Sequence, residues 1–171
     1  MDVFIKDRMN NRIEGEVSMK QGIMDKRLIG LDIEVKDGEE FLDQLSERLI
    51  ELGFVKDSFK EAIKEREREY PTALPTEPYA LAIPHADPEH VKKPFIAFTR
   101  LKKPIAWKAM GMKDLEIPVS FLFVLGFLEE EDNVELLRRI LEQFQEEEFL
   151  EQLKEITDEE ECMNLFCPIF E

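Results

Sequence analysis

A chain of 171 residues, 43% hydrophobic and 36% charged, has the composition of a single globular domain with a sizeable core. Its net charge of −16 disfavours nucleic-acid binding, because phosphate backbones are held mainly by Lys and Arg. No apolar run approaches the roughly 20 residues needed to cross a bilayer, and the N-terminus is too polar for a signal peptide. We therefore expect a cytoplasmic protein without direct membrane insertion, whose Cys162 and Cys167 are free, packed thiols.

The first half of the chain is predicted to contain one strand and two helices. Residues 1–26 show little periodicity and are expected to be an N-terminal extension, which leaves 27–171 as the domain. The alternation over 28–35 predicts a strand. A capping-box pattern and one apolar face predict a helix over 37–53, and a second helix is predicted over 57–68.

The second half alternates between apolar runs and amphipathic segments. Three prolines within residues 70–78 predict a loop. Apolar runs then predict strands at 79–83, 95–101 and 117–125, and apolar periodicity predicts helices over 133–144 and around 149–153. A capping-box pattern that begins with Thr157 predicts a last helix from 157 onward. The order is strand, two helices, three strands and three helices (β-α-α-β-β-β-α-α-α), which predicts an α/β fold: a three-layer α/β/α domain with a mixed sheet.

Both histidines of the chain, His85 and His90, lie within six residues of each other. An apolar run and Pro84 precede His85, which places it at the end of a strand, where functional side chains are often presented. A neutral imidazole nitrogen is a nucleophile that can carry a covalent group and release it again. The alternative is a structural His85 held by hydrogen bonds.

The sequence gives no support for a metal or a nucleotide cofactor. Asp87 and Glu89 accompany the two histidines, but their spacing matches no common zinc pattern. Gly111 stands alone, so a glycine-rich phosphate loop is missing. We expect neither a metal site nor a bound cofactor.

Acidic residues are concentrated near the C-terminus. From Glu129 to Glu161 there are 15 acidic residues against three basic ones, a net −12. Most of these side chains are expected to lie on solvated helix faces. The same charge also favours approach of a basic protein partner.

The segment Leu81-Ala-Ile-Pro-His85 resembles a known phosphorylation-site motif, an apolar-Ala-apolar-Pro-His run that carries phosphohistidine. Upstream, Arg66-Glu67 and Pro71-Thr72 resemble the Arg-Glu and Pro-Thr elements that precede this motif. With the element order, these features are similar to the type 2 enzyme IIA domain of the bacterial phosphoenolpyruvate-dependent sugar phosphotransferase system, in its fructose–mannitol superfamily. The resemblance covers about residues 28–167.

Within that superfamily the chain most resembles the galactitol-type branch, in which a second His follows the first by five residues, as His90 does here. The mannitol-type branch has a further functional His at the start of the helix after the last strand. That position falls near Asn133 in this sequence, so a mannitol assignment is disfavoured.

The resemblance implies that His85 accepts a phosphoryl group from phosphorylated HPr and passes it to a cysteine of enzyme IIB. Arg66 is expected to hold the phosphoryl oxygens, or else to be an ordinary surface Arg. Thr72 is expected to offer a hydroxyl to the site, or else to fix the proline-rich loop. His90 is expected to donate a hydrogen bond to the phosphoryl group or to the His85 ring, or else to be a loop residue.

Two other functions remain open at this stage. The first is a regulatory phospho-switch of the same fold, which binds partner proteins without feeding a transporter. The second is a binding domain that is never phosphorylated and in which His85 is structural. The sugar and the oligomeric state are not indicated by the sequence.

Overall fold

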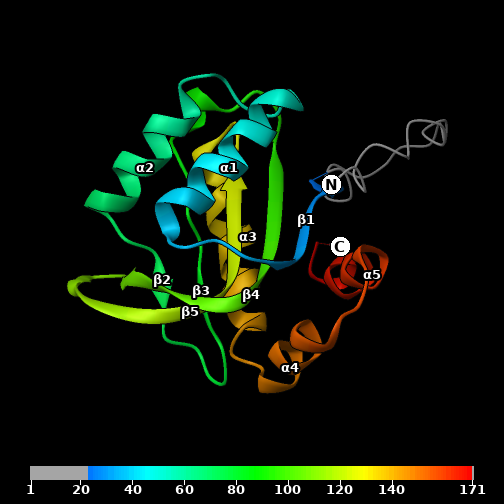
Figure 1. Cartoon of the computed structure of the whole chain (residues 1–171). Coiled ribbons are helices and arrows are strands. Elements are labelled where there is room, and N and C mark those ends of the chain that lie inside the picture. Colours follow the sequence, from blue (N-terminus) through cyan, green and yellow to red (C-terminus); the bar gives the residue numbers. More distant parts are fainter. Residues whose placement is uncertain (1–22, 171) are drawn as a thin grey trace, which may run out of the picture.

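Within residues 23–170, the computed structural model of the chain contains one mixed sheet of five strands and five helices (Figure 1). Side chains are described over this range except at 131–133 and 170. Of the extension expected over residues 1–26, residues 1–22 lie outside the described part of the chain. The predicted α/β class, with helices on both faces of a mixed sheet, is confirmed.

The elements follow one another with short connections. In chain order they are β1 (Met24–Ile33), α1 (Gly38–Glu51), α2 (Phe59–Glu69), β2 (Ala73–Leu74), β3 (Ala80–Ala82), the short 3₁₀ turn η1 (Pro88–His90), β4 (Phe95–Ala109), β5 (Met112–Gly126), α3 (Glu130–Gln143), α4 (Glu147–Glu155) and α5 (Glu159–Phe170).

The long β4–β5 hairpin forms the centre of the sheet. β4 pairs with β5 in antiparallel fashion and with β1 in parallel, while β3 runs parallel to β5 on the other side. β2 pairs antiparallel with β3 and meets the far end of β4, where Ala73 lies opposite Ala109. The mixed pairing leaves the C-terminal end of β3 beside the C-terminal half of β5.

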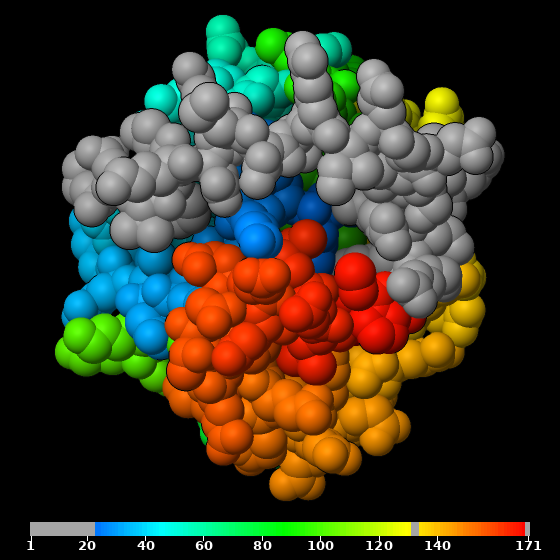
Figure 2. Space-filling model, turned by 90° about the vertical axis from the view of Figure 1, so that its right-hand side faces the viewer, coloured from blue at the N-terminus to red at the C-terminus, as the bar shows by residue number. Residues whose placement is uncertain are grey.

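Each face of the sheet is covered by its own set of helices. Successive residues of a strand point to opposite faces, so Ala97 and Val124 pack under α1 and α2, whereas Phe98 and Phe123 pack under α3, α4 and α5. Figure 1 shows α1 in front of the sheet and α3 behind it. Figure 2 shows the side of the molecule on which α4 and α5, in orange and red, form a continuous surface beside β1. Both faces are buried, which accounts for the unbroken apolar run near the end of β5.

One strand was not predicted. The proline-rich segment 70–78, predicted to be a loop throughout, contains the two-residue strand β2. Pro71 and Pro75 lie just outside this strand. Its own residues, Ala73 and Leu74, therefore keep the backbone N–H groups that a paired strand needs. This short strand pairs with β3, the strand that precedes His85.

Several boundaries differ from those expected. β4 continues to Ala109, beyond the expected 95–101, and β5 begins at Met112, before the expected 117. β1 begins at Met24, which is buried and lies opposite Ile96 of β4, so the boundary placed between residues 26 and 27 falls inside a strand. α3 begins at Glu130, three residues before the expected start.

The cap of the last helix also differs by one residue. Asp158 Oδ1 accepts a hydrogen bond from the Glu161 N–H (2.8 Å), and the Glu161 carboxylate accepts one from the Thr157 N–H (3.1 Å). The capping residue is therefore Asp158 rather than Thr157.

No helix within the described residues is long and apolar enough to span a membrane.

Candidate active site around His85

His85 lies immediately after β3, at the edge of β5. The Pro84 carbonyl accepts a hydrogen bond from the Leu125 N–H (3.1 Å), and His85 forms an isolated parallel bridge with the same residue. Pro84 is buried, whereas His85 is partly exposed. The sheet therefore supports the backbone up to Pro84 and presents the next side chain at its end.

The His85 ring is fixed by a carbonyl on its own chain. Nδ1 lies 2.9 Å from the carbonyl oxygen of Ile83, and because a carbonyl only accepts, Nδ1 carries the proton and donates it. The lone pair is then on Nε2. Burial lowers the pKa of His85 below its usual 6.5 and outweighs the Ile83 hydrogen bond, which acts in the opposite direction. The ring is thus a neutral nucleophile at pH 7.

Two opposite charges flank the ring. The Arg66 guanidinium donates to Asp87 Oδ1 (Nη1 to Oδ1, 3.0 Å), which joins α2 to the loop after His85. Both act on the pKa of His85, with Arg66 lowering it and Asp87 raising it. The Arg66 side chain is 37% exposed and also lies 5.9 Å from the centre of the Tyr70 ring, so it can reach an anion arriving from solvent.

Thr72 lies behind the site rather than on its surface. Its residue is only 4% exposed. The hydroxyl donates to Glu67 (2.9 Å to Oε1 and 3.1 Å to Oε2) and accepts from the Ile83 N–H (3.2 Å). Of the two expectations for Thr72, these contacts agree with the one in which it fixes the proline-rich loop.

His90 belongs to a neighbouring surface. Its Nδ1 lies 2.8 Å from Ser58 Oγ at the start of α2, and its Nε2 lies 3.3 Å from Glu89 Oε1. Its backbone carbonyl accepts from the Lys56 N–H (2.9 Å). These contacts tie the loop after His85 to the start of α2 and direct the His90 side chain away from a hydrogen bond with the His85 ring.

The position near Asn133, at which the mannitol-type branch has another His, falls in the first turn of α3. Its side chain lies outside the described residues. Among residues 23–170, no three His, Cys, Asp or Glu side chains come together in an arrangement that holds a metal ion.

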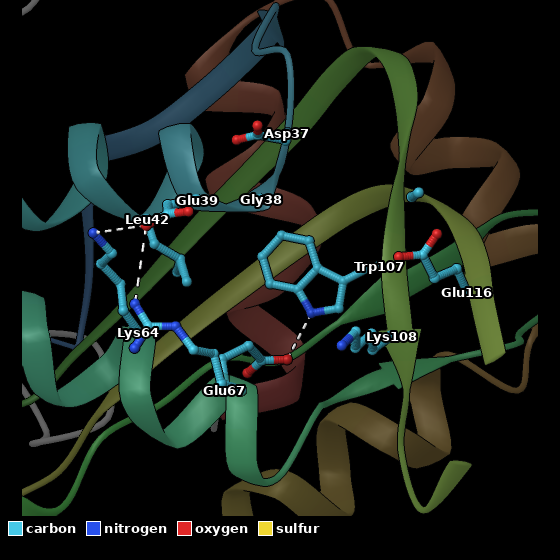
Figure 3. A pocket seen from close by; sticks show the side chains of 11 residues that line it. Asp37, Gly38, Glu39, Leu42, Lys64, Glu67, Trp107, Lys108 and Glu116 are labelled. Atoms are coloured by element: carbon cyan, nitrogen blue, oxygen red, sulfur yellow. Dashed lines mark hydrogen bonds and ion pairs between the residues drawn. The ribbon is translucent and has the colours of Figure 1, made fainter. Parts of the chain in front are cut away.

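Sequence reasoning missed two residues that the structure connects to the site, Glu67 and Trp107. Trp107 Nε1–H donates to Glu67 Oε1 (2.6 Å), and both side chains line a pocket of about 350 Å³ between α1, α2 and the β4–β5 hairpin (Figure 3). From the sequence, Glu67 was identified only as part of the Arg-Glu element, and Trp107 was not identified. The acidic side chain next to Arg66 and the single Trp of the chain are the two features that could have pointed to these residues.

The same pocket is lined by charged side chains that pair with one another. Glu39 accepts from Lys64 (3.2 Å), and Figure 3 marks this contact with a dashed line. Glu39 also lies 3.9 Å from Arg68. His85 is not among the residues that line the pocket.

Comparison with known proteins places the chain among phosphotransferase components. The family model described as "Phosphoenolpyruvate-dependent sugar phosphotransferase system, EIIA 2" matches residues 22–167. A fructose-like EIIA component of Escherichia coli is 30% identical over 131 residues, which cover 74% of this chain and 84% of that protein. A galactitol-specific EIIA component of Escherichia coli is 27% identical over 117 residues, which cover 68% of this chain and 77% of that protein.

Solved structures show the same fold. The nitrogen regulatory protein IIA-Ntr of Neisseria meningitidis superposes with a TM-score of 0.70 at 24% identity, over 86% of this chain and 99% of that one.

Proposed function

This chain belongs to the EIIA 2 family of the phosphoenolpyruvate-dependent sugar phosphotransferase system, and we propose that it is a phosphocarrier for sugar uptake. In this proposal His85 accepts a phosphoryl group from phosphorylated HPr and passes it to a cysteine of an enzyme IIB. Proteins of this family are phosphotransferases that act through phosphohistidine and work with EIIB partners. The galactitol-specific and fructose-like relatives support a sugar or sugar alcohol as the final acceptor.

The observation that carries the proposal is the hydrogen bond from His85 Nδ1–H to the Ile83 carbonyl. With Nδ1 occupied, the Nε2 lone pair attacks the phosphorus atom of phosphorylated HPr, and the donor bond to phosphorus breaks as the Nε2–P bond forms. In the second transfer the IIB thiolate attacks phosphorus, and the Nε2–P bond returns its electron pair to the ring. No nucleotide is needed at either step.

Arg66 is the residue we assign to charge stabilisation. Phosphoryl transfer depends mainly on in-line positioning and on cations near the equatorial oxygens. In the free protein Arg66 is held by Asp87, 3.0 Å away and two residues after His85. A phosphoryl group on Nε2 brings a second acceptor to the guanidinium, which has enough donors for both.

Thr72 and His90 have supporting roles in the proposal. Thr72 holds the Ile83 peptide through its hydroxyl. His90 holds the loop that carries Asp87 against the start of α2 through Ser58. We assign no direct contact with the phosphoryl group to either side chain.

The test is phosphoryl transfer in solution. The protein is mixed with phosphoenolpyruvate, enzyme I and HPr, and intact mass is used to detect an acid-labile, base-stable adduct of one phosphoryl group. We expect the adduct in the wild-type protein and in His90→Ala, which is the matched control, and no adduct in His85→Ala. An adduct retained in His85→Ala would remove the proposal.

A chase with an enzyme IIB distinguishes transport from regulation. The phosphocarrier hypothesis predicts that the adduct disappears from this protein and appears on the IIB cysteine. An adduct that forms normally but is drained by no enzyme IIB encoded in the same organism would instead favour the regulatory phospho-switch.

A further inference from the structure

Two sets of hydrogen bonds, joined by the backbone of Ile83, connect His85 with the protein interior. His85 Nδ1–H donates to the Ile83 carbonyl (2.9 Å), and the N–H of the same Ile83 residue donates to Thr72 Oγ1 (3.2 Å). The Thr72 hydroxyl donates to Glu67 (2.9 Å), and Trp107 Nε1–H donates to the same carboxylate (2.6 Å). We call these five residues the Glu67 network.

The Glu67 carboxylate is the acceptor at the inner end of this network. Its Oε1 receives three hydrogen bonds, from Trp107 Nε1, from the Thr72 N–H (2.7 Å) and from the Thr72 hydroxyl. Trp107 and Thr72 are only 5% and 4% exposed. Neither donor can therefore bind water in place of Glu67 unless the protein opens locally. A carboxylate accepts at both oxygens and donates at neither, which suits three converging donors.

The network is anchored to three elements. Glu67 is on the last turn of α2 and Trp107 is on β4, and Figure 3 shows the two side chains meeting across the pocket. On its other side the Trp107 ring packs against the start of α1. A Cβ added to Gly38 would lie 2.7 Å from Trp107 Cζ3, and Phe41 contacts the ring edge-on at 6.3 Å between centroids. The indole is therefore fixed from both sides.

Ile83 is the link between this buried arrangement and the reactive ring. Its N–H is fixed from behind by Thr72, and its carbonyl holds the His85 Nδ1 proton in front. Fixing Ile83 at its N–H limits how far its carbonyl can move, and the direction of this carbonyl selects which nitrogen of His85 carries the proton.

From this geometry we propose that Glu67 and Trp107 are positioning residues for phosphoryl transfer, which keep His85 in the Nδ1–H tautomer through Thr72 and the backbone of Ile83. The inference rests on the proposed function and deepens it. Neither residue touches the phosphoryl group. Their role is to keep Nε2 unprotonated and aimed outward before the donor arrives.

The test begins on the unphosphorylated protein, with ¹⁵N chemical shifts of the His85 ring as the readout. In the wild-type protein we expect the Nδ1–H tautomer to dominate. In Glu67→Ala we expect a mixture with the Nε2–H form, and a phosphorylation rate at saturating phosphorylated HPr that falls about tenfold, as is typical when a supporting hydrogen-bond partner is lost. The KM for phosphorylated HPr should change little, because the Glu67 carboxylate is engaged by the buried Thr72 and Trp107 side chains.

Three further variants separate positioning from a general effect on folding. Glu67→Gln keeps the acceptor oxygen and is expected to restore most of the tautomer preference and the rate. Glu65→Gln, an exposed acid on the same helix, is the matched control and should change neither. If Glu67→Ala unfolds, Trp107→Phe removes one donor and still reports on the network through the same shifts.

The outcomes are distinct. An unchanged tautomer and an unchanged rate in folded Glu67→Ala or Trp107→Phe would overturn the inference. Failure of the wild-type protein to be phosphorylated would overturn the proposed function instead, while the tautomer measurement would still decide the positioning role.

Discussion

The two faces of the sheet differ in what their buried side chains do. Under α3, α4 and α5 the core is aromatic and aliphatic apart from Arg100, whereas the face under α1 and α2 contains the polar Glu67 network. The proposed reacting residues, His85 and Arg66, belong to the second region. In the proposed account one face provides most of the apolar core, and the other also orients the proposed nucleophile.

The α3–α5 face is packed around four phenylalanine rings. Phe123 lies 4.8 Å from Phe98, 4.7 Å from Phe144 and 5.4 Å from Phe166 between ring centroids. Arg100, the buried charge on this side, is also engaged. It forms an ion pair with Asp32 (3.1 Å) and donates to carbonyls at the end of α4, those of residues 153, 154 and 156.

The largest effect is expected from breaking the aromatic face. Phe123→Ala should lower the free energy of unfolding by about 3–5 kcal/mol, because a fully buried ring is replaced by a cavity. Urea denaturation measures this change. Phosphorylation of the protein that remains folded should proceed at nearly the wild-type rate, and selective loss of phosphorylation at unchanged stability would contradict the separation of the two faces.

A smaller effect, on rate alone, is expected from Arg66. Arg66→Ala should slow phosphoryl transfer to His85 by roughly 10- to 100-fold without abolishing it, because one cation is lost from the equatorial oxygens. Single-turnover transfer from phosphorylated HPr provides the measurement. Arg68→Ala on the same helix is the matched control, since its partner is Glu39 in the pocket rather than Asp87.

The pH dependence sharpens the comparison further. Because burial lowers the pKa of His85 below 6.5, NMR titration of its ring should show a midpoint under that value. The stability that this group contributes is then present above pH 6.5 and is lost as the pH falls through the lowered folded-state pKa. Arg66→Ala should move the midpoint upward, since Arg66 is one of the groups that lower it. A downward movement would show that the Arg66 charge does not act on the ring as described.

The smallest effect is expected at His90. His90→Ala removes the hydrogen bond with Ser58 and should slow transfer to His85 by no more than a few-fold, since a single exposed hydrogen bond contributes about 1 kcal/mol. Ser58→Ala is the paired variant and should give a similar value in the same assay. A loss at His90 as large as that at Arg66 would indicate a direct role for His90 in the reaction.

Much of this arrangement could be predicted because its signals are local. The run before Pro84 indicated a strand end and so placed His85, and the Asp37 capping pattern marked the start of α1, where its Oδ1 accepts from the Glu40 N–H at 2.9 Å. The two-residue strand β2 was missed because its pairing depends on partners in β3 and β4 rather than on its own composition.

The contacts that define the site depend on residues far apart in the sequence. Arg66 and Asp87 are 21 residues apart, and Glu67 and Trp107 are 40 residues apart. No periodicity relates such positions, since their side chains meet only once the helices have packed on the sheet. A hydrogen bond from His90 to the His85 ring was one of the alternatives given for His90, and the packed structure places His90 Nδ1 2.8 Å from Ser58 Oγ.

The most direct test of the central claim is the position of the phosphoryl group on the ring. The protein is labelled with ¹⁵N-histidine, phosphorylated through enzyme I and HPr, and examined by ¹⁵N NMR at alkaline pH, where phosphohistidine is stable. The account predicts that the phosphoryl group is on Nε2 of His85, because Nδ1 faces the Ile83 carbonyl. Phosphorylation at Nδ1, or on His90, would contradict it.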